Sequence, residues 1–409
     1  MTPRALVFRD ATLVCPMGGV RQGDLLVRDG VIAAFGTIDA PDDADMVDAR
    51  RLTLAPAIVD LGVFAIDLPA FHAGGIVRVG LMPDQSPVLD DPGVVQRAAL
   101  IGRPGLWIHP ISAATRGLAG EDLAEMAINR DAGAKAVGTG RRWIADSGLM
   151  RKVLAYAHDL GMTVVARPED GNLVRGAVAT AGETATRLGL PAAPALAEPL
   201  AIARDLMLAE ETGAALHFDT VTTAAGFALI RAAKARGVAV SCGITPAHLL
   251  LSDIAMSDFR TFMHLSPPLR AESDRQAALA ALADGTIDVL HSAHDPRGPE
   301  EKRLPFADSR PGMAGAETLL ALGLGLVRDG GIAIERLFAL LAANPAKVLN
   351  VAAGTLEPGM PADLLLFDSE APWLVDGDRF RAKAGNTPFE GLPVQGRVKR
   401  LFKGGTALL

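Results

Sequence analysis

Aromatic residues and cysteines are scarce in this chain of 409 residues. Phe, Trp and Tyr together make up 4 % of the sequence, so the core must be built mainly from Ala, Leu, Val and Ile. The two cysteines, Cys15 and Cys242, lie far apart and show no CxxC spacing. This arrangement favours two reduced thiols and argues against a disulfide framework.

The sequence also lacks the features of a membrane or nucleic-acid-binding protein. No run of about 18 apolar residues occurs, and the N-terminal MTPRALVFRDATLV has no charged-then-apolar signal pattern. Acidic residues outnumber basic ones, 47 to 40, which argues against nucleic acid or an anionic membrane as partner. Phosphate-binding glycine motifs are missing as well. We therefore expect a cytoplasmic protein with neither a membrane nor a nucleic-acid partner.

The middle of the chain alternates short apolar runs with amphipathic helical ones. AKAVG (134–138) precedes DSGLMRKVLAYAHDLG (146–161), whose apolar residues recur at helical spacing, and MTVVAR (162–167) follows. Repeated strand–helix units predict a parallel sheet. The length has room for a closed (β/α)8 barrel of about 250 residues and a smaller domain. A doubly wound open sheet is the alternative fold.

The two ends of the chain predict β structure with glycine turns. Asp29-Gly30 stands between two apolar runs, which is a strong hairpin signal because glycine can adopt positive φ. Residues 354–368 and 396–409 have the same strand-like character. We predict a small composite, β-sandwich-like domain from residues 1–54 and 351–409, and a barrel over residues 55–350.

The stretch LAPAIVDLGVFAIDLPAFHAGGIVRVGLMP (54–83) predicts two buried strands joined by a connection. It resembles the opening of the barrel in the dihydroorotase branch of the amidohydrolase superfamily. Further segments similar to that family follow in its order, among them ITPAHLLLSD (244–253), SPPLRAESDR (266–275) and GNTPFEGLPVQGRV (385–398). The resemblance implies an amidohydrolase-type TIM barrel with a small domain assembled from both chain ends. Active members of that branch hydrolyse cyclic amides with the help of one or two divalent metal ions, so the resemblance also implies this chemistry.

The positions that the resemblance assigns to metal ligands and substrate contacts hold other residue types. A glycine has no side chain and a phenylalanine has no donor atom, so neither can bind a metal. The substrate positions fall on Ile66 and Asp84. From these losses we expect no metal cofactor and no catalysis. The degenerate ligand positions are Gly62, Phe64, Thr139, Arg167, Thr220 and Ala293.

Three functions follow from this interpretation. Inactive members of the family are non-catalytic subunits that assemble with aspartate carbamoyltransferase, so the resemblance first implies a structural subunit of pyrimidine biosynthesis in a homo- or hetero-oligomer. The alternative is an active hydrolase of cyclic amides with a metal-free or relocated zinc site, formed by His291, His294 and Asp295, with His248 or Asp219 as further candidates. A third hypothesis is an anion sensor that uses Arg167, with Arg141 or Arg142 contributing.

Arg167 needs a partner if it is buried, because an unpaired buried guanidinium is costly. We expect it to meet a carboxylate, with Asp219, Glu169, Asp170 and Asp84 as candidates. His217 is expected in the core. Glu183 and Glu198 are expected on the solvated surface.

Overall fold

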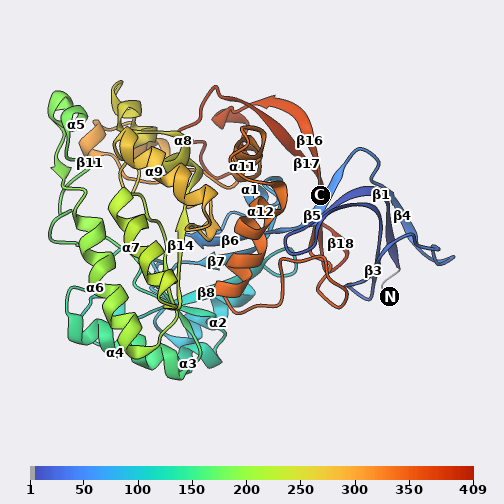
Figure 1. Cartoon of the computed structure of the whole chain (residues 1–409), viewed down its shortest axis with the longest axis horizontal. Helices are drawn as coiled ribbons and strands as arrows, with labels where there is room; N and C mark the ends of the chain where they lie inside the picture. The colour runs from blue at the N-terminus through green and yellow to red at the C-terminus, as the bar shows by residue number, and fades with distance from the viewer. Residues whose placement is uncertain (1–4) are drawn as a thin grey trace.

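The computed structural model describes residues 5–409, and its centre is an eight-stranded parallel sheet (Figure 1). The strands of this sheet lie side by side in the same order in which they occur along the chain. A doubly wound sheet would instead show a point where the strand order reverses. The two ends of the sheet meet where the backbone N–H of Phe64 donates to the carbonyl oxygen of His294 at 2.9 Å. The predicted TIM barrel is therefore confirmed, and the open-sheet alternative is wrong. The barrel strands are β6 (Ile58–Val63), β7 (Ile76–Leu81), β8 (Trp107–Ala113), β9 (Ala136–Gly138), β10 (Thr163–Ala166), β13 (Leu216–Phe218), β14 (Val240–Ile244) and β15 (Val289–Leu290).

Helices cover the outside of the barrel, and side-chain caps fix where several of them begin. The Asp146 carboxylate accepts the N–H of Leu149 at 2.7 Å at the start of α4, and the Thr223 hydroxyl accepts from Gly226 at the start of α7. The main helices are α1 (Leu68–Ala73), α2 (Pro92–Leu100), α3 (Met126–Asp131), α4 (Ser147–Asp159), α6 (Ala197–Thr212), α7 (Ala224–Ala235), α9 (Glu272–Ala283), α11 (Leu319–Arg328), α12 (Ile334–Phe338) and α13 (Asn344–Val348).

Two shorter helices and a small strand pair lie at the end of the barrel that is formed by the carboxyl ends of its strands. Figure 1 shows α5 (Glu183–Leu188), α8 (Pro246–Leu250) and β11 (Ala179–Thr180) together at this end. β11 pairs in parallel with β12 (Ala192–Ala193). Long connections at this end place extra side chains over the barrel mouth, where such folds carry their chemistry.

A second sheet combines strands from both ends of the chain. β5 pairs in parallel with β1 and antiparallel with β16, so it joins the N-terminal strands to the C-terminal ones. Asp29 and Gly30 connect β2 to β3 with φ values of 53° and 79°, as the hairpin signal predicted. The extra β-rich domain is confirmed, while its residue limits stay a prediction. Its strands are β1 (Leu6–Cys15), β2 (Gly19–Arg28), β3 (Val31–Gly36), β4 (Asp45–Asp48), β5 (Thr53–Pro56), β16 (Leu364–Leu374), β17 (Pro393–Lys403) and β18 (Thr406–Ala407).

Two further expectations from composition can be compared with the described residues. Cys15 and Cys242 are both free thiols, and Cys242 is buried. Over residues 5–409, no helix combines the length and apolarity that crossing a bilayer would need.

Candidate functional site

Several of the degenerate ligand positions lie close together at the carboxyl ends of the barrel strands. The backbone N–H of Arg167, after β10, donates to the hydroxyl of Thr139, after β9, at 3.0 Å. The hydroxyl of Thr220, after β13, lies 3.2 Å from His291 Nε2. A Cβ placed on Gly62, near the end of β6, would lie 3.5 Å from His291 Nδ1. These positions therefore surround one site at the barrel mouth.

Arg167 is buried there and paired with carboxylates, as its burial cost required. Its side chain is 4 % exposed, and Nη2 donates to Glu169 Oε2 at 2.9 Å and to the Ser266 hydroxyl at 2.9 Å. Nη1 lies 3.8 Å from Asp219 Oδ2. Burial by itself would lower the pKa of Arg167, but the negative charges of Glu169 and Asp219 outweigh it and raise the pKa. The guanidinium is permanently charged and faces two of the four candidate carboxylates.

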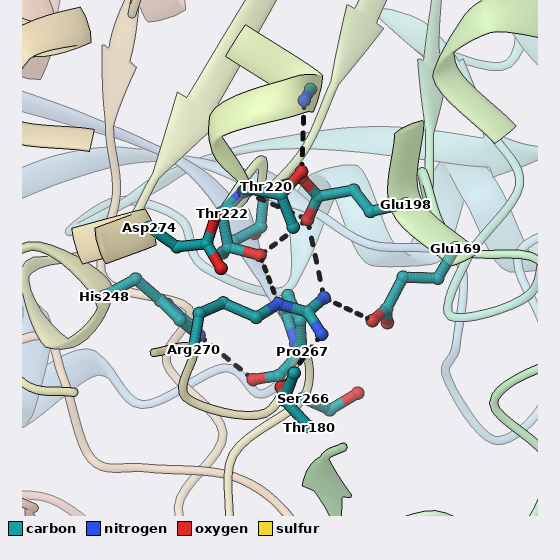
Figure 2. A network of polar contacts seen from close by, with 12 residues as sticks. Glu169, Thr180, Glu198, Thr220, Thr222, His248, Ser266, Pro267, Arg270 and Asp274 are labelled. Atoms are coloured by element: carbon teal, nitrogen blue, oxygen red, sulfur yellow. Dashed lines mark hydrogen bonds and ion pairs between the residues drawn. The ribbon is translucent and has the colours of Figure 1, made fainter. Parts of the chain in front are cut away.

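A second buried arginine extends this cluster, and the sequence analysis did not single it out. Arg270 donates to Glu169 Oε1 at 2.8 Å, and its Nη2 lies 3.5 Å from Glu198 Oε2 (Figure 2). Arg270 also donates to the hydroxyls of Thr222 and Thr180. Glu169 thus bridges Arg167 and Arg270, and the two guanidiniums keep its pKa below the ordinary value despite burial, which would raise it.

The surface position expected for Glu198 is wrong. Its side chain is fully buried and accepts the backbone N–H groups of Thr222 at 3.0 Å and Thr223 at 2.7 Å, together with both threonine hydroxyls. The charge is tolerated because donors surround both oxygens and Arg270 supplies a positive charge. Figure 2 shows Glu198 reaching toward Arg270 beside Thr222. Glu183, by contrast, is exposed as expected.

Asp219 is the titratable group at the mouth with a pKa close to neutrality. Burial raises its pKa to about 6, although Arg167 and the N–H of Thr220 pull it back, and the charges of Glu169 and Asp84 add to the rise. Two nearby polar atoms are buried without a hydrogen-bond partner, Asp84 Oδ2 and His291 Nδ1. Buried polar atoms without a hydrogen-bond partner, next to a carboxylate with a shifted pKa, are typical of a site that holds water or a ligand.

The histidines proposed as relocated zinc ligands have other contacts. His294 Nε2 lies 3.4 Å from Asp67 Oδ2, and its Nδ1 accepts the N–H of Ala316 at 3.3 Å. His248 bonds to the Thr245 hydroxyl at 2.8 Å and to the Pro267 carbonyl at 3.0 Å. His217, buried as expected, bonds to the Ser241 hydroxyl at 2.8 Å.

Asp295 is occupied by two arginines. Arg141 donates to Asp295 Oδ2 at 2.5 Å and Arg297 donates to the same oxygen at 2.8 Å. Arg141 also lies over the Phe64 ring, 3.7 Å from its centroid. Arg142 is exposed and Ile66 is half-buried against the apolar core. His291, His294 and Asp295 are therefore not brought together as a ligand set.

Residues 5–409 contain no group of three or more His, Cys, Asp or Glu side chains placed to hold a metal ion. Asp84, Asp219 and His291 do not form such a group either. The side chains at the mouth thus do not fit a zinc ion.

Comparison with known proteins identifies the family. The model described as "Amidohydrolase family" matches residues 118–408. A dihydroorotase of Pelotomaculum thermopropionicum is 38 % identical, over 99 % of this chain and 98 % of its own length. The chain belongs to the amidohydrolase family. A dihydroorotase-like protein of Pseudomonas aeruginosa is 37 % identical over 96 % of each chain. The L-hydantoinase of Arthrobacter aurescens superposes with a TM-score of 0.89 over 99 % of this chain and 96 % of its own, at 24 % identity, which supports the fold.

This amidohydrolase membership corrects two expectations. The expectation that the protein is not an enzyme is wrong, because relatives at 38 % and 36 % identity are named dihydroorotase and the similar structures are hydantoinases. The expectation of no cofactor is wrong as well, because relatives of these kinds typically depend on zinc. Both errors have one cause, because the absence of the family's ligands at six positions was interpreted as the absence of both catalysis and a metal cofactor. The described side chains still do not fit that metal, so we assign no step to it.

Proposed function

We propose that the protein is a cyclic-amide hydrolase of the dihydroorotase type, acting in pyrimidine biosynthesis through Asp219. The observation that carries the proposal is a buried carboxylate with a pKa of about 6 beside two unpartnered polar atoms at the barrel mouth. A group with this pKa is largely ionised at pH 7 yet can still pick up a proton, as a general base must. The dihydroorotases among the relatives support the choice of a cyclic amide as substrate.

Hydrolysis adds water across the ring amide. The water oxygen bonds to the carbonyl carbon, the C–N bond breaks, one proton leaves the water and one reaches the ring nitrogen. Asp219 accepts the proton from the water and then returns it to the leaving nitrogen. Arg167, 3.8 Å from Asp219, keeps the carboxylate ionised above its pKa and supplies positive charge toward the oxyanion that forms on the carbonyl.

The unpartnered atoms match the polar groups of a cyclic ureide. Burial lowers the pKa of His291 to about 4, so its ring is neutral at pH 7. With the proton on Nε2, beside the Thr220 hydroxyl, Nδ1 is free to accept. Asp84 Oδ2 is a second acceptor. A ring with two N–H donors and a carbonyl acceptor, such as dihydroorotate or hydantoin, satisfies both atoms.

The test is turnover of dihydroorotate and of hydantoin by untagged protein, measured after dialysis against chelator and again after zinc is added. The proposal expects ring opening of at least one compound in at least one of the two conditions, and at least about 100-fold slower turnover by Asp219→Asn in that condition. Wild-type turnover by Asp219→Asn would overturn the Asp219 mechanism. No ring opening of either compound in both conditions would overturn the proposed function itself.

We further propose that the protein assembles with the catalytic chains of aspartate carbamoyltransferase. The family resemblance supports this partner, and one surface feature favours an assembly. Leu196, the residue before α6, and Leu200 and Met207 on α6 are 61 %, 47 % and 65 % exposed and follow one another at helical spacing. Apolar side chains that share one exposed helix face are typical of an interaction surface.

Co-purification of tagged aspartate carbamoyltransferase catalytic chains with the untagged protein from the same organism tests this partner. The proposal expects a stable complex that Leu200→Lys together with Met207→Lys disrupts, while Arg231→Ala, on α7, does not. A complex that survives the double substitution would place the interface elsewhere. No complex with the wild-type chain would remove the partner.

A further inference from the structure

A cavity of about 480 Å³ lies on the outer side of the barrel, against the β16–β17 hairpin. Its walls come from α1, α11, the two strands of the hairpin and the loop that follows β16. Figure 1 shows β16 and β17 running beside α11 and α1, so elements from both chain ends meet there. The lining shares no residue with the barrel-mouth site. A volume of this size falls within the range of about 300–1,000 Å³ that small-molecule sites occupy.

The cavity presents two arginines whose guanidiniums form no close ion pair within the described part of the chain, although the charge of Arg381 acts on the nearby Glu317. Arg381 and Arg397 both line it, and neither forms an ion pair with residues 5–409. A third lining arginine, Arg379, is already paired with Asp376 at 3.0 Å. Two unpaired guanidiniums in one concavity attract a ligand with a doubly charged anionic group, because each can form two parallel hydrogen bonds to it.

Aromatic rings stand beside these cations. Trp373 is held in place because its Nε1–H donates to the Gly396 carbonyl at 2.9 Å. The guanidinium of Arg397 lies 5.2 Å from the centroid of the Trp373 ring. Phe380 lines the same cavity. An anion bound by Arg397 would therefore carry any attached planar ring alongside aromatic surface, where stacking is favourable.

A half-buried carboxyl group, that of Glu317, completes the lining. Glu317 Oε1 accepts the N–H of Ala382 at 2.9 Å, which fixes the side chain against the loop. Burial raises the pKa of Glu317 to about 7, although the backbone N–H groups and Arg381 oppose the rise. The group can thus accept a hydrogen bond from a ligand N–H or O–H, or donate one when protonated.

We propose that this cavity binds a nucleoside 5′-phosphate. Arg381 and Arg397 hold the phosphate, Trp373 and Phe380 contact the base, and Glu317 bonds to a hydroxyl or ring N–H of the nucleoside. The combination of arginines, aromatic rings and a carboxyl group favours a nucleotide over a bare anion, because phosphate alone would not contact the rings or bond to Glu317. The site is separate from the barrel mouth, and it stands whether or not Asp219 catalyses hydrolysis.

The experiment is titration calorimetry of the full chain with UMP and AMP, and with uridine and inorganic phosphate as separate probes. We expect saturable binding of a nucleotide that is at least about tenfold tighter than binding of phosphate, because stacking of the base on an aromatic ring adds to the affinity. Arg397→Ala and Arg381→Ala are expected to weaken nucleotide binding at least tenfold, with the melting temperature of the free protein unchanged because both side chains are exposed. Arg400→Ala, on the same strand as Arg397 but outside the cavity, is the matched control and is expected to bind normally.

Trp373→Leu separates the two halves of the site, because it is expected to weaken nucleotide binding and leave phosphate binding unchanged. Three results would each overturn the proposal: absence of saturable binding by both nucleotides at millimolar concentration, equal affinity for phosphate and nucleotide, or wild-type affinity in Arg397→Ala.

Discussion

Replacing Glu198 by alanine tests the buried charge network most severely. Glu198 is fully buried and accepts the N–H groups of Thr222 and Thr223 and both hydroxyls, and it faces Arg270 at 3.5 Å. Alanine would leave two buried N–H donors without a partner and Arg270 with Glu169 as its remaining carboxylate. Removing one partner from a buried ionic cluster costs about 3–5 kcal/mol, which is a large share of the stability of a typical domain.

Urea denaturation at pH 7, followed by circular dichroism, measures this loss. Glu198→Gln keeps the volume and one acceptor oxygen, so its free energy of unfolding is expected to lie between those of the wild type and Glu198→Ala. Glu210→Ala is the matched control because Glu210 lies on the same helix, α6, in an exposed pair with Arg236 at 2.9 Å. If Glu198→Ala loses no more stability than Glu210→Ala, the network does not stabilise the fold in the way described.

Three further predictions concern single side chains. Arg167→Met leaves two buried carboxylates without their shared cation, and urea denaturation is expected to show a loss of about 3–5 kcal/mol; a neutral result would contradict the pairing. His217 is buried and its pKa is lowered to about 3, so it stays neutral in the fold while the unfolded chain binds a proton below about pH 6.5. Wild-type stability relative to His217→Gln should therefore be constant above about pH 6.5 and fall by up to about 1.4 kcal/mol per pH unit as the pH drops toward the folded pKa; parallel stability curves would contradict this. Burial raises the pKa of the Cys242 thiol, so a thiol reagent is expected to label half-buried Cys15 in native protein and Cys242 only after denaturation; rapid native labelling of Cys242 would show that its site opens.

The barrel could be predicted from the sequence because strand and helix signals are local. The helical run at 146–161 contains α4 at Ser147–Asp159, and the strand-like run at 162–167 contains β10 at Thr163–Ala166. Each signal depends on the periodicity of neighbouring residues. The pairing of Arg167 could also be predicted, because the cost of burying a guanidinium holds whatever the fold.

The partners of Glu198 could not be predicted, because they are distant in the chain. Arg270 lies 72 residues from Glu198 and 101 from Glu169, and no local pattern links them. In the sequence Glu198 is an acidic residue in the first turn of a helix, which usually faces water. Only the fold brings the loops after β13 and β14 over this turn and surrounds the carboxylate with donors.

The error about catalysis has a related cause. Comparing six positions with a family pattern can show that expected ligands are missing, but it cannot detect groups that the barrel brings together at other positions. Asp84 and Asp219 were considered as partners for Arg167, yet the raised pKa of Asp219 depends on burial, and the unpartnered oxygen of Asp84 depends on side-chain placement. Neither property is visible in residue types alone.

The most direct test of the account is kcat/KM for dihydroorotate from about pH 5 to about pH 8, in the wild type and in Asp219→Asn. Because Asp219 acts as a base in its ionised form, the wild-type value is expected to rise through about pH 6 and then level off. Asp219→Asn is expected to lose at least about 100-fold. Asp205→Asn, which removes another buried carboxyl whose pKa burial raises to about 6, on α6, is expected to keep the wild-type profile. A profile without a rise near pH 6, or equal rates in Asp219→Asn and Asp205→Asn, would contradict the role of Asp219.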